Sequence, residues 1–174
     1  MLATAPLPLV SRKASGLKGR IRVPGDKSMS HRALMFGAIA IGETTISGLL
    51  EAEDVVNTAR AMSALGAAAI RGDDGRWRVQ GVGIAGLRSP EAALDFGNSG
   101  TGVRLAMGLM ATTPLTARCV GDASLSKRPM GRVTKPLELF GARFEMAEGG
   151  RLPLTLHGAK HATPVTYTLP VASA

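Results

Sequence analysis

The order of polar and apolar positions in the first half of the chain predicts a unit of four strands and two helices. Alternation of polar and apolar residues indicates a half-buried strand, and apolar residues three or four positions apart indicate one face of a helix. Asp54 is placed to cap the second helix, and Gly66 is placed to end it. The predicted elements are a strand at 20–23, a helix at 33–40, a strand at 44–48, a helix at 54–65 and a hairpin of strands at 67–70 and 77–80.

The same order begins again near residue 94, so the sequence contains an internal repeat. Arg32 and Arg104 are matching positions 72 residues apart, and Gly81 and Gly158 are 77 residues apart. So small a drift is typical of a duplicated supersecondary unit with short insertions. Pro136 predicts a kink or a late start in the second helix of this unit. The predicted elements are a strand at 94–96, a helix at 103–111, a strand at 117–121, a helix with Met130, Val133, Leu137 and Phe140 on one face, and a hairpin of strands at 141–144 and 154–156.

The last ten residues, Val165–Ala174, have the pattern of the opening strand of a third unit. Within them, Leu169-Pro170 occupies the place that Val23-Pro24 occupies in the first unit. The chain ends before the helix that would follow, and a strand without its crossover helix cannot bury its faces. We therefore expect this chain to be a piece of a longer protein.

Composition and charge narrow the classes of partner. The net charge of +8 calls for an anionic partner, but only 3% of the residues are aromatic, so base-stacking platforms for nucleic acid are not expected. Small phosphorylated or carboxylated ligands explain the charge at least as well. Cys119, the single cysteine, excludes an internal disulfide and fits a reducing compartment. Residues 1–19 contain no signal-peptide core and no apolar run is long enough to cross a membrane, so we expect a cytoplasmic protein without a membrane partner.

Polar turns precede the predicted helices, and they are the candidate binding sites. The first lies around Lys27 and Arg32, with Ser28 or Ser30 as the helix cap. A helix N-terminus flanked by cations is suited to a phosphate or carboxylate. One such corner alone would be interpreted as a capped helix with solvated cations, but the corner recurs, so these helix starts are expected to converge on one anion pocket. The further turns are Asn98-Ser99-Gly100-Thr101, Ser126-Lys127-Arg128-Pro129 and Ser173.

Other reactive residue types do not form a recognisable site in the sequence. The three histidines, His31, His157 and His161, have no metal-ligand spacing, so no metal site is predicted. Cys119 lies in an apolar predicted strand and is expected to be a core thiol.

Three stretches of the chain stand out, Pro24-Gly25-Asp26-Lys27-Ser28-x-Ser30-His31-Arg32, Gly97-Asn98-Ser99-Gly100-Thr101 and Gly121-Asp122-x-Ser124-Leu125-x-Lys127-Arg128-Pro129-Met130-Gly131. They resemble the motifs of the 5-enolpyruvylshikimate-3-phosphate (EPSP) synthases. Their order is that of the family, and the resemblance covers residues 18–174, which is less than half of a full-length member. The third stretch is most similar to the bacterial branch that includes glyphosate-tolerant enzymes.

The resemblance implies a fold and a domain organisation. The fold is an α/β (α+β) enolpyruvyl transferase-like inside-out barrel, in which each of two domains has three βαβαββ units about an approximate threefold axis. Residues 1–22 would hold a leader and a strand of the other, C-terminal domain. Residues 23–174 would be a partial N-terminal domain, with units at about 23–90 and 91–163 and the start of a third at 164–174.

The resemblance also implies an activity, the transfer of the enolpyruvyl group of phosphoenolpyruvate to the 5-hydroxyl of shikimate-3-phosphate with release of phosphate and without a metal or cofactor. The acid and base groups of the family lie beyond residue 174, so this fragment would need the complementary C-terminal half and would be inactive alone. In the family Gly100 leaves space for glyphosate, although Leu105 stands where many sensitive members have proline. The implied roles are Lys27 as a catalytic residue contacting both substrates, Ser28, Arg32, Ser173 and Ala174 for shikimate-3-phosphate, Gly100 and Arg128 for phosphoenolpyruvate, and Asn98 and Thr101 to shape the turn.

Alternatives remain at this stage. The enolpyruvyl transferase that acts on a UDP-sugar places a reactive cysteine in the loop before the Arg-Pro pair, whereas this chain has Ser124–Lys127 there and Cys119 upstream. The RNA 3′-phosphate cyclase shares the repeat. A basic nucleic-acid-binding module, which would bind with steep salt dependence, comes far behind.

Overall fold

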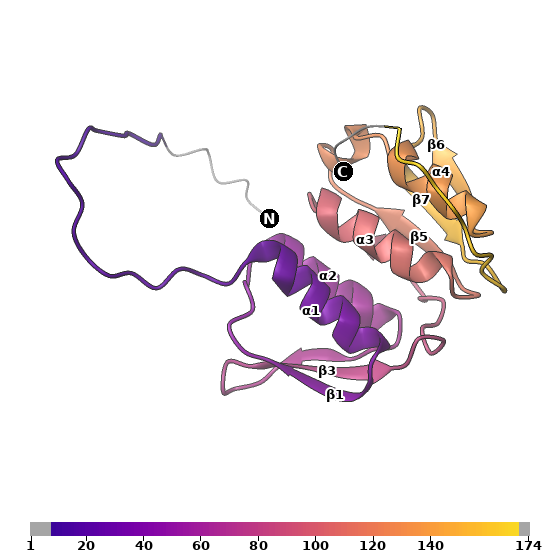
Figure 1. Cartoon of the computed structure of the whole chain (residues 1–174), viewed down its shortest axis with the longest axis horizontal. Coiled ribbons are helices and arrows are strands. Elements are labelled where there is room, and N and C mark those ends of the chain that lie inside the picture. The colour runs from indigo at the N-terminus through magenta and orange to yellow at the C-terminus, as the bar shows by residue number, and fades with distance from the viewer. Residues whose placement is uncertain (1–7, 171–174) are drawn as a thin grey trace.

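The structure of the chain is a computed structural model that describes residues 8–170, and these residues form two successive α/β units (Figure 1). The first sheet has the order β1-β3-β2, and both of its pairings are antiparallel. Ile70 faces Arg78 in the hairpin, and Thr44 of the neighbouring strand faces Val79. The predicted hairpin and its neighbouring strand are therefore confirmed. The first unit contains α1 (Lys27–Ile39), β1 (Ile41–Ile46), α2 (Glu53–Ala64), β2 (Ala69–Arg71) and β3 (Trp77–Val82).

The second unit repeats this arrangement and adds a strand. Its sheet has the order β4-β5-β7-β6, in which β5-β7-β6 corresponds to β1-β3-β2 of the first unit. The additional strand β4 pairs in parallel with β5, with Leu94 facing Cys119. The predicted duplication is therefore confirmed. The elements are β4 (Leu94–Asp95), α3 (Gly100–Ala111), β5 (Thr116–Val120), the 3-10 helix η1 (Leu125–Lys127), α4 (Gly131–Leu139), β6 (Arg143–Ala147) and β7 (Arg151–His157).

Two predicted strands do not form in the described residues. Residues 20–23 are irregular and unpaired, and their apolar side chains Ile21 and Val23 are 86% and 71% exposed. Residues 165–170 are also irregular, and residues 171–174 lie outside the described part of the chain. A strand is defined by its hydrogen-bonded neighbour, and within residues 8–170 neither segment has one. Neither segment therefore pairs as a strand within the described residues, while a strand of residues 1–22 in the other domain and a strand that continues through residues 171–174 stay predictions.

The helices pack together and join the two units in one hydrophobic core. Figure 1 shows α1 and α2 on one face of the first sheet, with α3 between them and the second sheet. Helix α2 contacts both α1 and α3, and α3 contacts α4 and β7. The buried side chains of this core include Phe96 and Trp77 and the methionines Met35, Met62, Met107, Met110 and Met130. Among the described helices, none has both the length and the apolar surface to span a bilayer.

The helix ends differ from two predictions. Asp26, not Ser28 or Ser30, caps α1, because its carboxylate accepts a hydrogen bond from the Met29 amide at 2.7 Å. Helix α2 begins at Glu53, so Asp54 lies inside its first turn and is not the cap. The predicted glycine at the end of α2 is confirmed, since Gly66 has a φ of +108°. Pro136 lies inside α4, six residues into a helix that starts late, at Gly131.

Gly81 and Gly158 lie at equivalent points where the last strand of each unit passes the end of the unit's first helix. An added Cβ at Gly81 would overlap the carbonyl oxygens of Gly37 and Ala40, and one at Gly158 would overlap those of Met110 and Thr113. The close approach is hydrogen-bonded, because the amide of the next residue, Ala159, donates to the carbonyl of Ala111 at the end of α3 at 2.8 Å. The repeat thus preserves a glycine for contact between strand and helix end.

Candidate functional site

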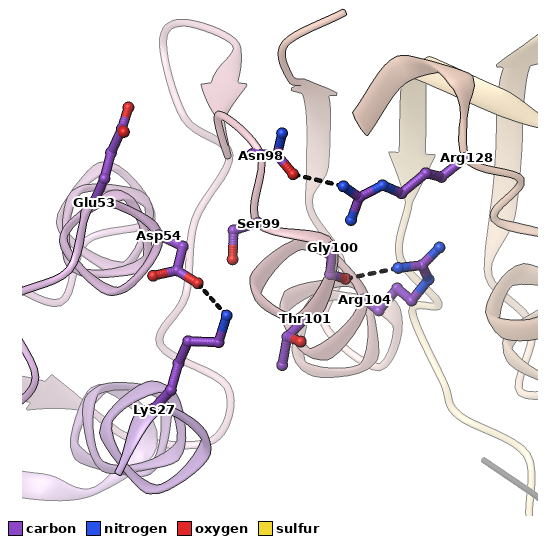
Figure 2. A pocket seen from close by; sticks show the side chains of 9 residues that line it. All are labelled: Lys27, Glu53, Asp54, Asn98, Ser99, Gly100, Thr101, Arg104 and Arg128. Atoms are coloured by element: carbon purple, nitrogen blue, oxygen red, sulfur yellow. Dashed lines mark hydrogen bonds and ion pairs between the residues drawn. The ribbon is translucent and has the colours of Figure 1, made fainter. Parts of the chain in front are cut away.

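The N-terminal ends of α1, α2 and α3 face one open cavity of about 430 Å³ (Figure 2). Each of these ends presents amide groups without helical partners and a partial positive charge. The lining residues come from all three helices, from the turn before α3 and from the end of η1. They are Lys27, Glu53, Asp54, Asn98, Ser99, Gly100, Thr101, Arg104 and Arg128.

Lys27 enters the cavity from the first turn of α1 and is held by Asp54 of α2. The Lys27 Nζ lies 2.8 Å from Asp54 Oδ2, and the two side chains are 53% and 19% exposed. Partial burial raises the pKa of Asp54, but the hydrogen bond and charge of Lys27 outweigh burial and hold that pKa below its ordinary value. Asp54 is therefore ionised at neutral pH and orients the ammonium group of Lys27.

The turn before α3 presents backbone to the cavity. Ser99 caps this helix, since its Oγ accepts a hydrogen bond from the Gly102 amide at 3.0 Å. Gly97 has a φ of +52°, a conformation that favours glycine. A Cβ on Gly100 would lie 2.7 Å from Arg104 Nη1 and 3.0 Å from Arg128 Nη1. The missing side chain of Gly100 therefore leaves room for the two guanidinium groups.

Arg128 is fixed by a short chain of side-chain hydrogen bonds. Its Nη2 donates to Asn98 Oδ1 at 2.6 Å and to Ser124 Oγ at 3.2 Å. The amide of Asn98 donates in turn to Asp122 Oδ2 at 2.8 Å, which sets the orientation of that amide. In the part of the chain that the structure describes, no carboxylate forms an ion pair with Arg128. Its charge is therefore available to an anion in the cavity.

Arg104 is a cavity residue that the sequence identified only as a repeat position. Its guanidinium donates to the carbonyls of Gly100 at 3.1 Å and Pro129 at 3.2 Å. Burial, followed by the nearby charges of Arg132 and Arg128, lowers the pKa of Arg104. The sequence could have identified Arg104 by its position, because it is a cation one turn after the start of a helix whose N-terminus was already a candidate site.

The structure assembles part of the predicted site. Lys27, Asn98, Gly100, Thr101 and Arg128 line the same cavity, although they come from three separate stretches of sequence.

The other predicted binding residues lie elsewhere or are not described. Ser28 and Arg32 do not line this cavity, and the exposed Arg32 donates to the Ser28 carbonyl at 3.2 Å. Ser173 and Ala174 lie outside the described residues. Asp54, predicted only as a cap, is instead the partner of the cavity lysine.

Cys119 lies in β5, where it is fully buried. Burial raises the pKa of this thiol to about 12, so it is not a reactive cysteine of the kind used by the enzymes that act on a UDP-sugar. Residues 8–170 also contain no group of three His, Cys, Asp or Glu side chains arranged to hold a metal ion. The cavity itself is lined by three cationic side chains, Lys27, Arg104 and Arg128, a set whose charge suits an anion.

Known proteins are similar to this chain in sequence and in structure. Residues 11–174 match the family model described as EPSP synthase (3-phosphoshikimate 1-carboxyvinyltransferase). A 3-phosphoshikimate 1-carboxyvinyltransferase of Afipia carboxidovorans is 60% identical over 172 residues, which are 99% of this chain and 39% of the relative. The enzyme of that name from Novosphingobium aromaticivorans is 64% identical over 158 residues, 91% of this chain and 36% of the relative.

A solved EPSP synthase from Acinetobacter baumannii superposes with a TM-score of 0.83 at 44% identity and covers 90% of this chain and 35% of its own. The chain thus spans less than two fifths of the length of these relatives. The family match, however, extends over nearly all of its residues. The chain belongs to the EPSP synthase family.

Proposed function

We propose that this chain forms the N-terminal, substrate-binding part of a 3-phosphoshikimate 1-carboxyvinyltransferase. The observation that supports this most directly is the cavity in which Lys27, Gly100 and Arg128 meet. These residues are the ones for which the family motifs imply contact with phosphoenolpyruvate. The cytoplasmic location stays a prediction.

Phosphoenolpyruvate would bind between Lys27 and Arg128. It has a carboxylate and a phosphate, and the planar guanidinium of Arg128 can donate two parallel hydrogen bonds to either group. Lys27 lies across the cavity and acts as a point charge that can contact both substrates. Shikimate-3-phosphate would extend from Lys27 toward Ser28 and Arg32 on α1, and Ser173 and Ala174 would approach its phosphate.

The reaction needs groups that this chain does not supply. Transfer forms a bond between the 5-hydroxyl oxygen of shikimate-3-phosphate and the central carbon of phosphoenolpyruvate, and later breaks the bond from that carbon to the phosphate oxygen. A proton leaves the hydroxyl group, and another is added to and removed from the terminal carbon. The complementary C-terminal part is the proposed source of these acids and bases, and it is the partner of this chain. Residues 1–22 are proposed to add a strand to that second domain.

Reconstitution with the missing part tests the proposed function. The part of the Afipia carboxidovorans enzyme that follows its match to this chain would be expressed separately and mixed with residues 1–174. We expect phosphate release from phosphoenolpyruvate only when both parts and shikimate-3-phosphate are present. Lys27→Met in the same mixture should remove this turnover. Turnover by residues 1–174 alone, or none from an associated and folded mixture, would contradict the proposal.

Gly100 is proposed to control access of glyphosate to the same cavity. In Gly100→Ala the added methyl group lies against Arg104 and Arg128, the ends of flexible side chains that can move by a few tenths of an ångström. We expect the inhibition constant of glyphosate to rise more than the KM for phosphoenolpyruvate in the reconstituted enzyme. Gly108→Ala, on the same helix with open space around its Cβ, is the control. Equal changes in the two constants would show that the methyl group does not discriminate.

A further inference from the structure

His31 is a buried histidine directly behind the cavity lysine, and the family motifs assign it no role here. It lies on α1, one helical turn after Lys27, and none of its surface is exposed. Its Nδ1 lies 2.8 Å from Thr58 Oγ1 on α2. Its Nε2 is buried without a hydrogen-bond partner among the described residues and lies 3.8 Å from Asp54 Oδ2.

The hydrogen bonds of Thr58 determine which ring nitrogen of His31 is protonated. A threonine hydroxyl has one proton to donate, and Thr58 donates it to the Asp54 carbonyl at 3.2 Å. With its proton used in this way, Thr58 Oγ1 is assigned as the acceptor of a hydrogen bond from His31 Nδ1–H. In the neutral ring, Nε2 consequently has a lone pair, and that lone pair faces the carboxylate of Asp54.

This arrangement affects Lys27 because Asp54 Oδ2 lies between two basic groups. The Lys27 ammonium is 2.8 Å from that oxygen and His31 Nε2 is 3.8 Å from it, on the buried side. A lone pair on Nε2 repels the carboxylate oxygen of Asp54, so of the two basic groups only Lys27 attracts that carboxylate. A proton on Nε2 would attract the same oxygen and compete with Lys27 for it.

We propose that His31 is a positioning residue that keeps Lys27 paired with Asp54 at the cavity while the imidazole is neutral and weakens that pair when Nε2 gains a proton. The consequence for catalysis rests on the function proposed above for Lys27. A lysine released from Asp54 has more rotamer freedom to lose when substrate binds, so the KM for phosphoenolpyruvate should rise more than kcat falls.

The charged groups that act on His31 set the direction of its pH dependence. Burial lowers the pKa of His31 most, Asp54 on α2 raises it, and Lys27 and Arg32 on its own helix lower it further, so that the pKa lies below its usual value of 6.5. Helix α3 and strands β1 and β3 also pack against α1 and hold Arg104, Glu43 and Arg78, but the main charges that shift this pKa are on α1 and α2. The neutral ring therefore predominates at pH 7.5, and Lys27 is released only as the pH falls below 6.5.

Nuclear magnetic resonance of the chain tests the coupling without any enzyme assay. Ring nitrogen shifts at pH 7.5 should show His31 protonated at Nδ1 and unprotonated at Nε2. The Lys27 Cε–H signals should move as the pH falls from 8 to 5, with the same midpoint as the His31 ring. A ring protonated at Nε2 at pH 7.5, or Lys27 signals that do not follow His31, would overturn the proposal.

His31→Asn keeps an N–H donor for Thr58 and cannot be protonated in this pH range. In this variant the Lys27 signals should no longer move with that midpoint. His157→Asn is the matched control, because His157 likewise lies between a threonine, Thr116 at 3.1 Å, and a carboxylate, Glu145 at 3.1 Å, but on the second sheet. The control should leave the pH dependence of the Lys27 signals unchanged, and a change as large as that caused by His31→Asn would contradict the proposal.

Kinetics of the reconstituted enzyme provide the second test. Between pH 7.5 and pH 5.5, kcat/KM for phosphoenolpyruvate should fall about three- to tenfold less in His31→Asn than in the unmodified enzyme, mainly through KM. In an Asp54→Asn background, His31→Asn should have no further effect, because both changes act on one pair. Independent effects of the two changes would overturn the proposal. An inactive mixture whose Lys27 signals still follow His31 would instead contradict the proposed function alone.

Discussion

Replacing Arg128 with alanine is expected to lower kcat/KM for phosphoenolpyruvate in the reconstituted enzyme by about ten- to a hundredfold while leaving the fold intact. The guanidinium lines the cavity and forms no ion pair within the described residues, so its full charge is available to the substrate. Loss of a charge-assisted contact costs about 1.5–3 kcal/mol, and about 1.4 kcal/mol corresponds to a factor of ten. The hydrogen bonds lost with Asn98 and Ser124 are exposed and add little to stability.

Two further variants separate the position of Arg128 from its charge. Arg143→Ala removes the same charge from β6, at the far edge of the second sheet, and should change the KM by no more than about twofold. Arg128→Lys retains the charge but loses the planar pair of donors, so its kcat/KM should be intermediate. Steady-state kinetics with phosphoenolpyruvate varied at saturating shikimate-3-phosphate would measure all three. Unchanged kinetics for Arg128→Ala would remove this residue from the binding site.

Gly158→Ala is expected to lower the free energy of unfolding by about 3 kcal/mol, a large part of the stability of a small domain. The added Cβ would overlap the carbonyl oxygens of Met110 and Thr113, which belong to the end of α3 and the turn after it. Backbone carbonyls cannot rotate away as a side chain can. Either β7 separates from the helix or the hydrogen bond from the Gly158 amide to Leu115 is lost. Urea denaturation followed by circular dichroism would measure the change.

The repeat supplies a second test of this contact and a control. Gly81→Ala should destabilise the chain in the same way, because its Cβ would overlap the carbonyls of Gly37 and Ala40. Gly108→Ala, on the exposed side of α3, meets nothing and should be neutral or stabilising by up to about 1 kcal/mol. If Gly158→Ala unfolds within about 0.5 kcal/mol of the unmodified chain, the strand and helix end are not in tight contact.

Local patterns were sufficient to predict most of the helices and strands. The glycines at 66, 81 and 158 and the alternating runs around them depend on neighbours within a few positions, so the duplicated order could be inferred before any contact was known. The cap of α1 could not be inferred from the sequence, because Asp26, Ser28 and Ser30 lie within five positions and all three side chains are able to cap a helix. Which of them does so depends on where the first turn begins.

Contacts between distant segments account for what the pattern missed. Residues 20–23 alternate as a strand should, yet among residues 8–170 β1 has no parallel neighbour of the kind that β4 provides for β5. The same limit applied to the candidate site. The motifs identified Lys27 and Arg128 as candidate binding residues, but the pairing of Lys27 with Asp54 depends on how α1 packs against α2. The contact between His31 and Thr58 depends on the same packing of α1 against α2.

The burial of Cys119 makes this chain convenient for chemical labelling. It is the single cysteine of the sequence, and in the folded chain it is inaccessible and protonated, whereas thiol reagents attack the thiolate. Its rate of modification therefore measures how often the second sheet opens. A cysteine introduced on the surface, such as Arg118→Cys, would be labelled selectively with a fluorophore while the native thiol is retained. Such a labelled chain would report its association with the C-terminal part directly, by fluorescence anisotropy.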